Sequence, residues 1–150
     1  MATINTCNNI TMTPGPIIIV DADQRSTEFY AEVLGAIGVE NELRFFDNGP
    51  DALNYLKATD ENPFIILAEI DLQEMDGLEM KTIIQQDEFL KNKAIPFVFI
   101  TRDLSAGSVS KAQRLNVQGY FEKPKDLVYV ERLMLRIFEY WELSKHMNNI

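Results

Sequence analysis

The chain of 150 residues has one cysteine and one histidine. Cys7 has no second cysteine with which to form an internal disulfide bond, and this favours a reducing compartment. His146 lies in a polar stretch at the end of the sequence. A histidine metal site, a zinc site and a Ser-His or Cys-His nucleophile pair are therefore not expected. We predict no catalytic residues and no enzyme activity.

Basic residues are also scarce, because 14 lysines and arginines face 23 acidic residues and the formal net charge is −9. A negative field of this size repels nucleic-acid phosphates and anionic lipid headgroups. No apolar stretch reaches the length of a membrane span, and the N-terminus lacks the pattern of a signal peptide. We expect a soluble, cytoplasmic domain that binds neither nucleic acid nor membrane.

The chain divides into three parts. Residues 1–16 are polar and without periodicity, which predicts a flexible N-terminal leader. Residues 17–145 contain all the patterned segments and are long enough for one domain with a buried core. Residues 146–150 form a short tail.

Five short apolar runs alternate with five segments of helical periodicity. The runs are 17–20, 43–46, 64–68, 96–100 and 119–121. The helical segments follow Asp23 and Asn48, surround Leu78, and cover 104–115 and 127–141, while 87–94 is interpreted as a connector. This alternation predicts an α/β fold with one parallel sheet, right-handed crossovers and helices on both faces.

Polar side chains follow four of these strands: Asp21, Glu69, Thr101 and Lys123. In a doubly wound sheet such positions converge on one crevice at the carboxyl ends of the strands. Two carboxylates, a hydroxyl and an ammonium at one place suit divalent-cation and phosphoryl chemistry.

Five motifs occur in order: Ile-Ile-Ile-Val-Asp at 17–21, Asn-Gly at 48–49, Met-Asp-Gly-Leu-Glu at 75–79, Ile-Pro-Phe-Val-Phe-Ile-Thr at 95–101 and Gly-Tyr-Phe-Glu-Lys-Pro at 119–124. From about Ile17 to Trp141 the chain resembles the chemotaxis-regulator-like receiver domain of two-component response regulators. The resemblance implies a doubly wound, flavodoxin-like sheet of strand order 2-1-3-4-5 with five helices. The segment 89–91 is similar to stand-alone receivers that work with phytochrome-type kinases.

Two positions depart from the family's pattern. Glu69 stands where the family has its phosphoacceptor aspartate, and Ala22 stands where it has the second acid of an adjacent pair. The resemblance leaves Asp21 and Glu69 as metal ligands, so we expect no cofactor or only weak Mg²⁺ binding. It also assigns Thr101, Tyr120 and Lys123 to the phosphate site and switch, although Tyr120 equally fits packing on an edge strand.

Glutamate places its carboxylate about 1.5 Å further from the main chain than aspartate does. In-line phosphoryl transfer tolerates little misplacement, and an error near 1 Å costs on the order of 100-fold. We therefore expect Glu69 to pair with Lys123, to approach Thr101 and partly to imitate the phosphorylated state. The predicted function is a stand-alone pseudo-receiver that acts through contacts with a sensor histidine kinase or another signalling protein.

Two alternatives stay open. A working receiver would accept a phosphoryl group on Glu69 or Asp71, with Asp21 and Asp23 sharing the metal. A flavodoxin-like cofactor binder would need Gly, Ser or Thr donors after the first strand, where this chain has acids.

The final helical segment has apolar residues on its outward side. Val128 and Leu135 fall opposite the buried stripe when the segment is projected at 100° per residue. Receiver-like domains often associate through this helix and its neighbours. We predict that the chain forms a homodimer through the face of the fourth helix, fifth strand and fifth helix.

Overall fold

The computed structural model describes residues 15–144. Most of the predicted leader (residues 1–16), Cys7, His146 and the tail at 146–150 therefore lie outside the described residues.

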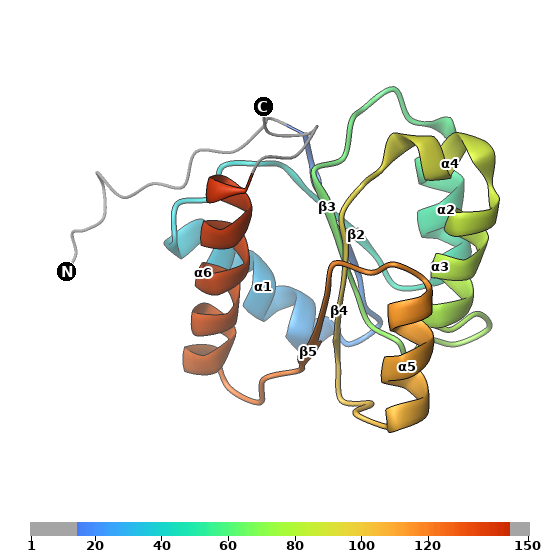
Figure 1. Cartoon of the computed structure of the whole chain (residues 1–150). Coiled ribbons are helices and arrows are strands. Elements are labelled where there is room, and N and C mark those ends of the chain that lie inside the picture. The colour runs from blue at the N-terminus through green and yellow to red at the C-terminus, as the bar shows by residue number, and fades with distance from the viewer. Residues whose placement is uncertain (1–14, 145–150) are drawn as a thin grey trace.

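A single parallel sheet of five strands organises the described part of the chain (Figure 1). Its strands are β1 (Ile17–Val20), β2 (Leu43–Phe46), β3 (Ile65–Ala68), β4 (Phe97–Thr101) and β5 (Gly119–Glu122), in the order β2-β1-β3-β4-β5. All four neighbouring pairs are parallel. The predicted flavodoxin-like α/β fold, with strand order 2-1-3-4-5, is confirmed.

Helices cover both faces of this sheet, and each face has its own apolar core (Figure 1). The helices are α1 (Gln24–Ala36), α2 (Gly49–Ala58), α3 (Gly77–Gln86), α4 (Glu88–Lys93), α5 (Ala106–Arg114) and α6 (Leu127–Leu143). α1 and α6 pack on one face, whereas α2 to α5 lie on the other. The three central strands are buried along their whole length, as unbroken apolar runs predict.

The prediction of five helices was wrong, because the described residues form six. The additional helix, α4, lies within the segment 87–94 that was interpreted as a connector. The Asp87 side chain accepts a hydrogen bond from Leu90 N at 3.0 Å and begins the helix. Leu90 is buried, and Ala94 ends the helix in the left-handed conformation (φ 51°).

Capping side chains fix where several other helices begin. Asp23 and Asn48 accept hydrogen bonds from the first turns of α1 and α2. Asp76 forms a reciprocal capping box with Glu79 at the start of α3. Ser105 caps α5, so this helix begins at Ala106 rather than at the predicted Leu104. No helix among residues 15–144 combines the length and apolarity needed to cross a membrane.

Candidate functional site

Four polar side chains meet at the carboxyl ends of the central strands. Asp21 follows β1, Glu69 follows β3, Thr101 is the last residue of β4 and Lys123 follows β5. All four residues are buried, with exposed fractions of 5%, 6%, 0% and 4%. Burial of three ionisable groups is costly unless they are paired and hydrogen-bonded to one another.

Glu69 makes four hydrogen bonds with its carboxylate. Lys123 Nζ lies 3.0 Å from Oε1. The Thr101 hydroxyl donates to Oε2, and the backbone N–H groups of Ile70 and Asp71 donate to the same oxygen at 2.8 and 3.1 Å. Both oxygens of the glutamate are therefore engaged by groups of the protein itself.

Lys123 bridges two carboxylates. Its Nζ lies 2.8 Å from Asp21 Oδ2 as well as 3.0 Å from Glu69 Oε1. The second oxygen of Asp21 accepts the backbone N–H of Asp23 at 2.9 Å. Burial raises the pKa of Asp21, although the hydrogen bond from Lys123 acts in the opposite direction. Burial disfavours the charged form of Lys123, but the hydrogen bonds and charges of Asp21 and Glu69 outweigh it and raise its pKa.

Tyr120 lies outside this cluster but is connected to it. Its hydroxyl donates to the backbone carbonyl of Asp103. The backbone N–H of Asp103 in turn donates to the Thr101 hydroxyl at 3.1 Å. A hydrogen-bonded chain therefore runs from Glu69 through Thr101 and Asp103 to Tyr120 on β5.

Asp103 was not among the residues predicted from the sequence. Its carboxylate accepts the Ser105 N–H at 3.0 Å and the Ser108 hydroxyl at 2.6 Å. The hydrogen bond from Ser108 is the main cause that lowers the pKa of Asp103. An aspartate two residues before a serine at a helix start is typical of such a turn, so a signal was present in the sequence.

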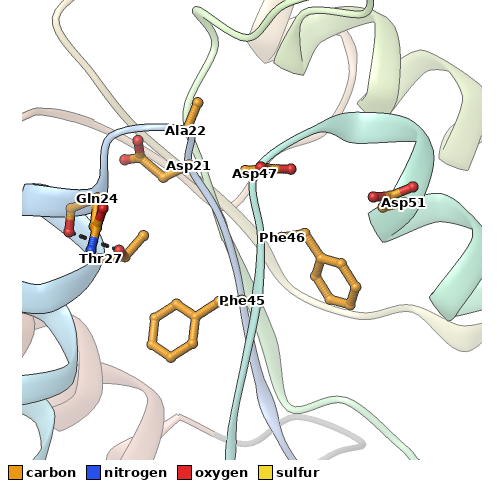
Figure 2. A pocket seen from close by; sticks show the side chains of 8 residues that line it. All are labelled: Asp21, Ala22, Gln24, Thr27, Phe45, Phe46, Asp47 and Asp51. Atoms are coloured by element: carbon orange, nitrogen blue, oxygen red, sulfur yellow. Dashed lines mark hydrogen bonds between the residues drawn. The ribbon is translucent and has the colours of Figure 1, made fainter.

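Two hollows flank the buried cluster. One, of about 470 Å³, lies between the ends of β1 and β2, and Figure 2 shows the Ala22 methyl group and Asp47 near the ends of these strands. The other, of about 500 Å³, opens beside Glu69 and Thr101, and exposed Asp71 contributes to its wall. Asp47 and Asp51 in the first hollow were also not predicted. The side chain of Asn48 donates to both of their carboxylates, at 2.7 and 3.0 Å.

The residues present do not fit a divalent cation. Such a cation needs several free oxygen ligands, but those of Asp21 and Glu69 accept hydrogen bonds from Lys123 and other donors. Ala22 offers no side-chain oxygen, and Asp23 accepts the Arg25 N–H as the cap of α1. Within residues 15–144 no three His, Cys, Asp or Glu side chains are grouped so that they could hold a metal ion.

The two predicted interface residues lie on α6, away from the buried cluster. Val128 is exposed, whereas Leu135 is half-buried rather than fully outward. Other exposed apolar residues of this helix are Tyr129, Tyr140 and Leu143.

The sequence and the fold are similar to those of known response regulators. The response regulator Rcp1 of Synechocystis sp. is 26% identical over 133 residues, which are 85% of this chain and 89% of Rcp1. The crystal structure of the Mn²⁺-bound form of response regulator Rcp1 has a TM-score of 0.77 at 24% identity, covering 89% of this chain and 98% of that one. The phosphorylated cyanobacterial phytochrome response regulator RcpA has a TM-score of 0.79 at 24% identity, covering 88% and 96%.

The family model that describes the response regulator receiver domain matches residues 17–134. This match spans most of the chain, including all five strands and the buried cluster at their ends. The chain therefore belongs to the response regulator receiver domain family.

Proposed function

We propose that this receiver domain has a degenerate phosphoacceptor site and works in two-component signalling through protein–protein contacts. The observation that carries the proposal is the contact set of Glu69. At the position of the family's acceptor, both carboxylate oxygens accept hydrogen bonds from Lys123, Thr101 and two backbone N–H groups. A nucleophile must present a free lone pair in line with the phosphorus atom, and the hydrogen bonds to both oxygens of Glu69 compete for these lone pairs.

The length of the side chain adds to this argument. The carboxylate of Glu69 lies about one C–C bond, ~1.5 Å, beyond the reach of an aspartate. It contacts Lys123 and Thr101, which the family pattern assigns to the phosphoryl group. Glu69 therefore partly substitutes for that group and holds the hydrogen-bonded chain through Thr101, Asp103 and Tyr120 in one arrangement.

The partners are a sensor histidine kinase or another signalling protein, together with a second copy of this chain. The face that we assign to self-association is formed by α5, β5 and α6, which correspond to the predicted fourth helix, fifth strand and fifth helix. Val128, Tyr129 and Tyr140 are exposed on α6, and Phe121 of β5 lines a hollow of about 210 Å³ with Tyr140.

A phosphorylation assay tests the degenerate site. The wild-type chain is incubated with a small-molecule phosphodonor, with and without Mg²⁺, and its intact mass is measured. We expect no added phosphoryl group. The double variant Glu69→Asp, Ala22→Asp restores the family's acids and is expected to gain one group when Mg²⁺ is present.

Two outcomes have different meanings. A phosphoryl group on the wild-type chain would refute the degenerate site and support a working receiver. The variants Glu69→Gln and Asp71→Asn would then identify the acceptor, because only the variant that lacks it loses the added mass. If the double variant also gained no phosphoryl group, the rest of the domain would no longer support phosphoryl transfer.

A further inference from the structure

We propose that Lys123 is the built-in cation of this site, so that the site is occupied by the protein's own ammonium group and takes up no Mg²⁺. The Nζ atom lies 2.8 Å from Asp21 Oδ2 and 3.0 Å from Glu69 Oε1. These two carboxylates are the acids that a divalent cation would have to share. The side chains of all three residues are less than 10% exposed.

The hydrogen bonds around the two carboxylates leave little for a cation to bind. Asp21 directs one oxygen to Lys123 and the other to the Asp23 N–H. Glu69 directs one oxygen to Lys123 and the other to three further donors. A cation that entered would have to displace Lys123 and leave a buried ammonium group without its partners, which is strongly unfavourable.

The neighbouring residues strengthen this arrangement. Ala22 contributes only a methyl group to the hollow beside Asp21, so a third carboxylate is missing there. Asp47 and Asp51, which also line this hollow, are hydrogen-bonded to Asn48. The two charges of Asp21 and Glu69 are therefore partly compensated by one internal positive charge, where an external divalent ion would supply two.

This inference concerns the site of the proposed function and rests on it in one respect: the domain is taken to work without phosphoryl transfer. Its consequence is that the conformation of the domain does not follow the concentration of Mg²⁺. Regulation must then come from a partner that binds the domain surface.

Direct Mn²⁺ titration tests the proposal, with the loss of the electron paramagnetic resonance signal of free Mn²⁺ as the readout of binding. The wild-type chain is expected to leave this signal unchanged up to millimolar Mn²⁺, and its thermal midpoint is expected not to move. Stoichiometric binding by the wild-type chain would overturn the proposal, and this result needs no variant.

Two variants test whether Lys123 is the reason why the site takes up no divalent cation. Lys123→Met and Lys123→Gln leave two buried carboxylates without a counter-charge, so their thermal midpoints should fall by roughly 10 °C. Millimolar Mn²⁺ should bind to them and recover part of this loss. The matched control is Lys81→Met. Lys81 is the other buried lysine of the described residues, and its ammonium group lies beside Gln85 and the Phe97 ring. The thermal midpoint of this variant should not respond to Mn²⁺.

Folded Lys123 variants that bind no more Mn²⁺ than the wild-type chain would refute the role of this lysine. Failure of this inference is distinguishable from failure of the proposed function, because one is read by Mn²⁺ binding and the other by added mass. A chain that binds Mn²⁺ but gains no phosphoryl group would overturn only the inference. A chain that gains the group without binding Mn²⁺ would overturn only the proposed function.

Discussion

Two lysines are buried among residues 15–144, in opposite electrostatic settings. Lys123 lies between the carboxylates of Asp21 and Glu69, and its pKa is raised. Lys81 of α3 donates to the Gln85 side chain at 3.2 Å and lies 5.4 Å from the centre of the Phe97 ring. Burial lowers the pKa of Lys81. The presence of a carboxylate partner therefore decides whether the pKa of a buried lysine is raised or lowered.

The two lysines should give opposite dependences of stability on pH. The folded state holds the Lys123 proton more tightly than the unfolded state does. The contribution of Lys123 to the free energy of unfolding is therefore full below the ordinary lysine pKa of 10.5, and it is lost as the pH rises through the raised pKa. For Lys81 the folded state binds the proton less tightly, so its contribution grows as the pH rises from the lowered pKa towards 10.5.

Urea unfolding of the wild-type chain, Lys123→Met and Lys81→Met between neutral and alkaline pH measures these contributions. Near neutral pH, Lys123→Met should cost about 3–5 kcal/mol. Lys81→Met, which roughly conserves volume, should cost less than about 1.5 kcal/mol. Towards alkaline pH the difference between wild type and Lys123→Met should shrink. Parallel pH profiles for all three proteins would contradict this assignment.

At the scale of single residues, the sequence predicted the members of the buried cluster and the contacts of Glu69 with Lys123 and Thr101, but not its backbone hydrogen bonds. Asp21, Glu69, Thr101 and Lys123 were found because polar residues at the ends of apolar strands must converge in a parallel sheet. The number of hydrogen bonds to Glu69 depends on its rotamer and on the backbone of residues 70 and 71, which no pattern encodes. The Tyr30 hydroxyl shows the same limit. Tyr30 is buried on α1, and no sequence pattern indicates that its hydroxyl finds no hydrogen-bond partner among the described residues.

Among the elements, the strands and the long periodic helices were predictable, and the one short helix, α4, was not. The central strands and the helices capped by Asp23 and Asn48 carry strong local signals. α4 has six residues and buries only Leu90, so no hydrophobic period can develop within it. The only sequence signal for the start of α4 was the capping residue Asp87, and the same residue ends α3.

Two glycines within helices should respond oppositely to alanine. A Cβ atom on Gly77, at the start of α3, would collide with the Glu69 carbonyl oxygen and the Phe99 ring. One on Gly107 of α5 would meet no atom within 4 Å. Gly107→Ala should therefore raise the free energy of unfolding by about 0.5–1 kcal/mol, because alanine favours the helix.

Gly77→Ala should instead lower stability, since both the β3 end and the start of α3 must shift. The collision involves the backbone of Glu69, so a measurable change in the local contacts of this residue is also expected. Chemical denaturation of both variants measures the stabilities, and nuclear magnetic resonance shifts of residues 69 to 71 report the displacement. Equal stabilisation by both substitutions would show that the close packing at Gly77 is not present in solution.

At the scale of the whole molecule, the hydrogen-bonded chain from Glu69 ends at Tyr120, on the strand that borders the proposed association face. The buried cluster and the α5–β5–α6 face are thus connected through β4 and β5, which pair in parallel. A fixed arrangement at Glu69 would hold this face in one state. The fold class and strand order were predictable at this scale, but the partial burial of Leu135 was not, because it depends on how α6 rotates against its neighbours.

Self-association should depend on the outward side of α6. Val128→Asp places a charge among exposed apolar side chains and should weaken a homodimer by at least about tenfold in Kd. Leu135→Asp should do the same, with circular dichroism to verify that this half-buried position still permits folding. The control is Phe89→Asp, because Phe89 is also exposed but lies on α4, which is not part of the α5–β5–α6 face.

Sedimentation velocity over a range of concentrations measures the association. The wild-type chain and Phe89→Asp should show the same shift from monomer to dimer, and the two α6 variants should show it only at higher concentration. A wild-type chain that stays monomeric throughout would refute the homodimer. If Phe89→Asp alone abolished association, the interface would include α4 instead of α6, because a charge acts where it is desolvated and not where it stays in water.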